Sequence, residues 1–198
     1  MKWLKHSDLE GKHAILSPSS FSWLNYDRQK LATVFRNRLA KFLGTKIHAF
    51  AATAIELGQK LPRSAKTLNM YVNDAIGFRL DPEVVLFYSK NCFGTADAIG
   101  FDGHVLRIHD LKTGVTPAHI DQLRIYAALY CLEYKVDPKT IEIVLRIYQN
   151  NAIVEEISDP LCIKDIMNKI VDFDKVLDEI RKEENIYDID VEVNDDAD

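Results

Sequence analysis

Apolar residues in the first part of the chain recur at helical spacing. A Ser-Pro-Ser-Ser segment at Ser17 is a typical helix start, and the apolar pattern continues from about residue 21 to residue 42. Gly44 is a helix-terminating residue, so we expect a break there and a second, alanine-rich helix over about residues 46–59. A short third helix is expected over about residues 68–78.

The pattern changes to that of β-strands in the middle of the chain. Residues 83–88, Glu-Val-Val-Leu-Phe-Tyr, are rich in strand-forming types, and residues 92–101 are a second candidate. Asp102-Gly103 is a hairpin signal between that segment and a third strand over residues 105–111. We therefore expect three adjacent strands in an antiparallel meander.

The remaining pattern is helix, strand, helix, over about residues 116–133, 141–148 and 160–184. The whole order predicts an α/β fold with a central mixed β-sheet flanked by helices. We expect one domain over residues 1–184 and an acidic, flexible tail over residues 185–198. Apolar residues of the last helix are spaced three and four apart: Ile163, Ile166, Ile170, Phe173, Leu177 and Ile180.

Composition narrows the class of protein. The chain is 47% hydrophobic and 28% charged, which is typical of a globular protein and argues against bulk disorder. It has neither an apolar run of about 18 residues nor an N-terminal signal-peptide core, so we expect a cytoplasmic protein with no membrane segment. The cysteines Cys92, Cys131 and Cys162 form no C-x-x-C pair, so a zinc or iron–sulfur site is not expected.

The net charge of −5 conceals a strong asymmetry. Residues 28–66 hold nine Lys or Arg and one acidic residue, whereas residues 155–198 hold sixteen acidic and five basic residues. A protein that binds a polyanion needs such a basic segment where the phosphates lie. The alternative is a helix face that is merely solvated by charge.

The middle strands carry the residues with the clearest chemistry. Asp110 and Lys112 are two apart and therefore lie on one face of the predicted strand. With a turn at residues 102–103, Asp97 can lie near Asp110, and two converging carboxylates suit Mg²⁺ or Mn²⁺. A lysine beside them can orient a water and offset charge on a phosphorane-like transition state. D-x-K alone is a weak signal, because exposed strand ends often carry such residues.

Two further elements strengthen this pattern. His48 stands near the start of the expected second helix, where a lone histidine more often packs than binds a metal. Gln122 and Tyr126 are four apart and share one helical face with His119, which is equally compatible with half-buried structure.

Taken together, the order G-x-x-x-H, G-T-A-D, D-L-K-T-G and Q-L-R-x-Y resembles the RecB-like branch of the PD-(D/E)XK nucleases. The resemblance spans about residues 16–148 and is strongest to small phage or prophage exonucleases similar to lambda exonuclease. It implies a PD-(D/E)XK, or restriction-endonuclease-like, core. It also implies a Mg²⁺- or Mn²⁺-dependent DNA exonuclease that acts in recombination or repair.

The resemblance also implies roles for individual residues. His48, Asp97 and Asp110 would be metal ligands, with the Leu111 carbonyl as a fourth. Asp97, Asp110 and Lys112 would carry catalysis. An iron–sulfur cluster is not implied, because the relatives that hold one use four cysteines.

Substrate contacts are expected from two regions. Gln122 and Tyr126 would steady the site or contact DNA. The further candidates are Thr113, next to the catalytic lysine, and four basic residues chosen by position alone: Lys46, Arg36, Arg38 and Lys41.

DNA is the expected partner, with a single-strand annealing protein or a recombinase as a further one. A homo-oligomer in the form of a closed ring would be built through the last helix. The alternative is that the apolar stripe of this helix covers the protein's own sheet. If the chain is phage-encoded, it would act in the bacterial host cytoplasm. The alternatives are a structure-specific endonuclease or resolvase, and a non-catalytic DNA-binding recombination scaffold.

Overall fold

The computed structural model describes residues 4–9, 11–12 and 14–184. The chain forms two compact units, with the boundary between Ile47 and His48. The single domain expected over residues 1–184 stays a prediction, and the expected tail over residues 185–198 lies outside the described residues. None of the described helices has the length and apolarity that a membrane span requires.

The first unit is helical. It contains the short 3-10 helices η1 (Ser7–Leu9) and η2 (Pro18–Asn25) and the first part of α1 (Arg28–Glu56). The helix predicted from about residue 21 begins instead at Arg28. Asp27 caps this start, because its Oδ1 accepts a hydrogen bond of 2.7 Å from the Lys30 N–H. The predicted break at Gly44 was wrong, because one glycine costs a helix only about 1 kcal/mol relative to alanine.

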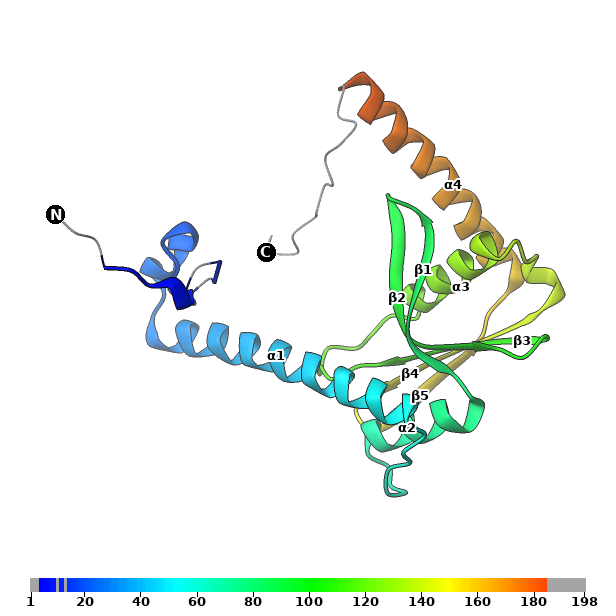
Figure 1. The fold of residues 1–198 in the computed structure, drawn as a ribbon, viewed down its shortest axis with the longest axis horizontal. Coiled ribbons are helices and arrows are strands. Elements are labelled where there is room, and N and C mark those ends of the chain that lie inside the picture. Colours follow the sequence, from blue (N-terminus) through cyan, green and yellow to red (C-terminus); the bar gives the residue numbers. More distant parts are fainter. Residues whose placement is uncertain (1–3, 10, 13, 185–198) are drawn as a thin grey trace. The chain divides into compact units, whose positions relative to one another are not determined.

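The second unit is built on a five-stranded mixed sheet in the order β1-β2-β3-β4-β5 (Figure 1). β3 and β4 are parallel and the other neighbours are antiparallel, which confirms the α/β class, the mixed sheet and the meander. The strands are β1 (Asp81–Ser89), β2 (Cys92–Phe101), β3 (Val105–Leu111), β4 (Glu142–Gln149) and β5 (Ala152–Ile157).

The sequence analysis missed β5. It follows a tight turn at Asn150 and Asn151, whose φ angles are 51° and 59°. Asparagine tolerates this left-handed conformation better than most residues, so the Asn-Asn pair was the available hairpin signal.

Helices cover both faces of the central strands. They are α2 (Thr67–Phe78), α3 (Asp121–Glu133) and α4 (Pro160–Glu183), with a 3-10 turn η3 (Pro138–Thr140) before β4. On one face the Phe78 ring of α2 packs edge-on against His109 of β3. On the other face Ile108 shares the hydrophobic core with Leu123 of α3 and Ile163 of α4. This core fixes the strands from which the candidate site projects.

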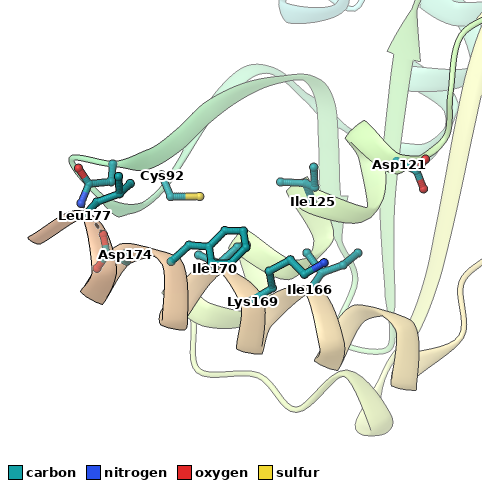
Figure 2. Close-up of a pocket in the computed structure, with 10 residues that line it drawn as sticks. Cys92, Asp121, Ile125, Ile166, Lys169, Ile170, Asp174 and Leu177 are labelled. Carbon is teal, nitrogen blue, oxygen red and sulfur yellow. Dashed lines mark hydrogen bonds between the residues drawn. The ribbon is translucent and has the colours of Figure 1, made fainter. Parts of the chain in front are cut away.

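The apolar stripe of α4 changes role along the helix. Ile163 and Met167 are buried in the core, whereas Phe173, Leu177 and Ile180 are exposed. A groove of about 460 Å³ lies between α4, α3 and the β1–β2 hairpin, and Ile166, Ile170, Phe173 and Leu177 are among the residues that line its α4 side. Figure 2 shows these three elements around the groove. The first half of the stripe therefore covers the protein's own core, and the second half is an apolar surface.

Candidate metal centre

The candidate site lies where β2 and β3 separate. Their pairing ends at Ala98 and His109, so Asp97 and Asp110 are the next residues along the two strands. Asp97 Oδ2 accepts a hydrogen bond of 2.8 Å from the Leu111 N–H. A carboxylate thus takes the place of a strand carbonyl at the fork, and the two aspartates converge as the sequence predicted.

Asp110 and Lys112 form a close pair. The Lys112 Nζ lies 3.1 Å from each carboxylate oxygen of Asp110 and donates a hydrogen bond to Oδ1. The Asp110 side chain is only 4% exposed, and its buried Oδ2 receives no hydrogen bond from any described residue. Burial, followed by the nearby Asp97 charge, raises the pKa of Asp110, whereas Lys112 opposes that shift.

A chain of side chains holds Lys112 in place. The Lys112 Nζ donates to Gln122 Oε1 at 2.8 Å, and Gln122 Nε2 donates to the Tyr126 hydroxyl at 3.2 Å. Gln122 and Tyr126 share one face of α3, as their spacing predicted. His119 does not join them on that face, because α3 begins only at Asp121.

His48, in the part of α1 that belongs to the second unit, reaches Asp97. Its Nδ1 lies 3.3 Å from Asp97 Oδ2. That contact is the main reason why the pKa of His48 is raised, with burial acting against it. His48 is therefore neither a freely exposed nor a fully packed histidine.

The sequence analysis missed Glu83, the third member of this cluster. One potential ligand atom from each of His48, Glu83 and Asp97 lies within 4.8 Å of the others. Glu83 stands between the β1–β2 pairs Pro82–Ala98 and Val84–Ala96, hence opposite Asp97. A charged residue in the register position facing Asp97 was the available signal, but it required the β1–β2 pairing to be known.

The residues present fit a divalent cation. Burial and the charge of Asp97 raise the pKa of Glu83, as they do that of Asp110. Carboxylate oxygens and one imidazole nitrogen are donors that Mn²⁺ accepts, and the carboxylates suit Mg²⁺. His48, Glu83 and Asp97 could hold the ion, whereas Asp110, which pairs with Lys112, is not among the three residues whose ligand atoms converge.

The other predicted residues lie outside this cluster. Leu111 contacts the cluster by donating its N–H to Asp97 Oδ2, and the predicted role of its carbonyl as a metal ligand stays a prediction. Thr113 follows Lys112 and is exposed. The basic candidates are exposed on α1 in the first unit: Arg36, Arg38, Lys41 and Lys46.

Gly94 is a second residue that the sequence analysis left without a role. A Cβ at this position would lie 3.1 Å from Tyr126 Cε1, so the ring would have to move. We predict that Gly94→Ala keeps the fold, at a cost of about 1–3 kcal/mol. We also predict that it lowers the rate of the DNA cleavage implied by the sequence resemblance roughly tenfold, through Tyr126, Gln122 and Lys112. Gly77→Ala is the matched control, since a Cβ there meets nothing within 4 Å. Cleavage rate and thermal unfolding decide: lower stability with an unchanged rate would make Gly94 a packing residue only.

Known proteins add no independent support for a function. The geometry of Asp97, Asp110 and Lys112, with His48 and Glu83 beside them, is the observation on which a function must rest. Comparisons with protein-family models, with curated proteins and with solved structures found no match to this chain.

Proposed function

We propose that this chain is a metal-dependent DNA exonuclease with a PD-(D/E)XK core, as the sequence resemblance implies. The observation that carries the proposal is the convergence of Asp97, Asp110 and Lys112 at the fork of β2 and β3. Asp110 is nearly buried and Lys112 is the cation beside it, an arrangement that costs desolvation energy and therefore suggests a role beyond stability. A non-catalytic scaffold would have no physical need for this arrangement.

The metal ion and Lys112 would have different roles in phosphodiester hydrolysis. A bound Mg²⁺ or Mn²⁺ would supply Lewis acidity and lower the pKa of a water. Lys112, held by Asp110 and Gln122, offers Nζ protons to the attacking water or to the charge that develops on the phosphoryl oxygens. Attack of water on phosphorus breaks the P–O3′ bond and leaves a 5′-phosphate and a 3′-hydroxyl.

One assay tests this proposal directly. End-labelled linear DNA and covalently closed circular DNA are incubated with the protein, with Mg²⁺, Mn²⁺ or EDTA. Release of labelled nucleotides from linear DNA alone, only with metal, is the expected result. Cleavage of closed circles would instead identify an endonuclease or resolvase, and DNA binding without cleavage of either form a scaffold.

DNA binding is predicted to depend on the basic segment over residues 28–66. Replacing Arg36, Arg38 and Lys41 together by Glu should lower affinity and flatten the slope of log K against log salt by up to about 2.7, at about 0.9 per lost phosphate contact. Fluorescence anisotropy over a salt series measures this slope. The control reverses exposed lysines elsewhere: Lys139, Lys164 and Lys175. Equal slopes for the two triple variants would show that the basic segment is a solvated surface and does not contact DNA phosphates.

A homo-oligomer formed through α4 is also part of the proposal. Phe173 and Leu177 border the groove of Figure 2 and are exposed, whereas Ile163 is fully buried. We predict that Leu177→Asp yields a folded monomer, whereas Ile163→Ala lowers the free energy of unfolding by about 2–5 kcal/mol. Light scattering at micromolar concentration, with thermal unfolding, separates the two effects. A wild-type protein that is monomeric would rule out the oligomer.

A further inference from the structure

The β1–β2 hairpin has two unlike faces. Leu86 and Ala96 point into the core that α3 completes. The alternating residues point the other way: Val85, Phe87 and Phe93 are 57%, 48% and 63% exposed. Together these three side chains form a contiguous apolar surface on one strand face, and such a contiguous surface is a candidate binding site.

This outer face runs directly into the candidate metal centre. Counting along the β1–β2 register, the outward pairs are Phe87 with Phe93, then Val85 with Thr95, then the position where Glu83 faces Asp97. Residues on one strand face recur about every 6.6 Å, so the aromatic pair lies roughly 13 Å along the hairpin from the cluster. Both features therefore belong to one continuous surface of the second unit.

The side chains of this surface indicate which kind of ligand binds there. Val85, Thr95, Phe87 and Phe93 carry no charge, so they offer phosphates no ion pair. The centroids of the two rings lie 6.4 Å apart, and their planes are 31° from parallel. Exposed rings of this kind stack with nucleobases irrespective of sequence. Bases in a duplex are already stacked and paired, so only unpaired bases can use the rings. A protein seated on Val85 and Thr95 would cover the adjacent Glu83 and Asp97, whereas a substrate strand would lead into them.

We propose that the outer face of the β1–β2 hairpin binds unpaired nucleobases, so that the substrate is a single-stranded DNA end or overhang whose backbone enters the cluster of His48, Glu83 and Asp97. This inference rests on the proposed function and specifies its substrate. Phe87 and Phe93 are the stacking residues, and Val85 is the apolar link between them and the cluster.

The test exploits the difference between a ring and an aliphatic side chain. In a Lys112→Ala background, which prevents cleavage, anisotropy measures binding of oligo-dT, of an abasic oligomer of equal length and of a blunt duplex. The double variant Phe87→Leu/Phe93→Leu keeps an apolar surface but removes the rings, whereas Phe87→Tyr/Phe93→Tyr keeps them. Phe101→Leu, an exposed ring at the far end of β2, is the matched control.

The leucine variant is expected to bind oligo-dT at least about tenfold more weakly, with abasic and duplex affinities unchanged, because it loses stacking alone. The tyrosine variant and the Phe101 control should bind oligo-dT within about twofold of the parent. Equal affinity of the leucine variant for oligo-dT, or an equal loss for the abasic oligomer, would overturn the proposal. So would a loss confined to the tyrosine variant, which would mark the face as a packing surface.

Two further measurements keep the result interpretable. If the double leucine variant unfolds, Phe93→Leu alone, at the more exposed ring, should still weaken oligo-dT binding several-fold; no effect would refute the inference. Wild-type cleavage with Mg²⁺ or Mn²⁺ separates the two hypotheses. If the wild-type protein cleaves DNA but the leucine variant binds oligo-dT as tightly as its parent, only the stacking proposal is refuted. If the wild-type protein neither binds nor cleaves DNA, the proposed function is refuted as well.

Discussion

Asp97→Asn, Asp110→Asn and Lys112→Ala are each expected to lower the rate of metal-dependent DNA cleavage at least about a hundredfold, the usual scale for one group of a cooperating site. Lys112 is the one cation that contacts Asp110 among the described residues, and Asp97 holds the end of β3 through the Leu111 N–H. Because the three groups act together, combining two substitutions should cost little more than one. Single-turnover cleavage of labelled DNA measures each rate.

Asp102→Asn is the appropriate control. Asp102 lies in the turn between the same two strands and accepts hydrogen bonds from the His104 and Val105 N–H groups, which an asparagine Oδ1 can also accept. Its rate should stay within about twofold of the wild-type rate. Metal-free DNA binding by Lys112→Ala should largely survive. Full cleavage by the double aspartate variant, or undiminished cleavage in EDTA, would contradict the assignment of these residues.

The central part of the site was predictable because it depends on local rules. The period of a strand places Asp110 and Lys112 on one face, and the Asp-Gly turn brings Asp97 back beside them. The helical period likewise joins Gln122 and Tyr126. Each of these inferences needs only the sequence spacing within one element or one hairpin.

The parts that failed depend on packing or on weaker local preferences. Gly44 did not end α1, because the cost of one glycine is small beside the gain from a continuous helix. Glu83 and Gly94 gained their roles only through the β1–β2 pairing and the packing of α3 on it. In the same way, the two halves of the α4 stripe have one spacing but different surroundings, which spacing alone does not distinguish.

Glu83 makes the candidate metal centre testable apart from the proposed catalytic residues Asp110 and Lys112. Its φ is +52°, a left-handed conformation that costs a non-glycine residue about 1–2 kcal/mol. The pKa of its carboxyl is also raised, by burial first and by Asp97 second. Strain and charge repulsion at one position both oppose stability, so we expect that binding of a cation is what compensates them.

Glu83→Gln and His48→Ala should therefore each raise the metal concentration for half-maximal cleavage at least about tenfold, as loss of a ligand does. His48→Ala should impair Mn²⁺ more than Mg²⁺, because the imidazole suits Mn²⁺ better. Glu83→Gly should lose metal affinity in the same way, yet raise the free energy of unfolding by up to about 1 kcal/mol, since glycine adopts the positive φ freely.

Calorimetric metal titration and thermal unfolding of these variants decide between a ligand and a packing role. His104→Ala, at an exposed histidine beside the β2–β3 turn, is the control and should change neither quantity. If His48→Ala lowers the melting temperature but leaves the metal titration unchanged, His48 is a packed residue. A Glu83→Gly variant that is less stable and binds metal normally would show that the cluster of His48, Glu83 and Asp97 holds the fold together and does not hold an ion.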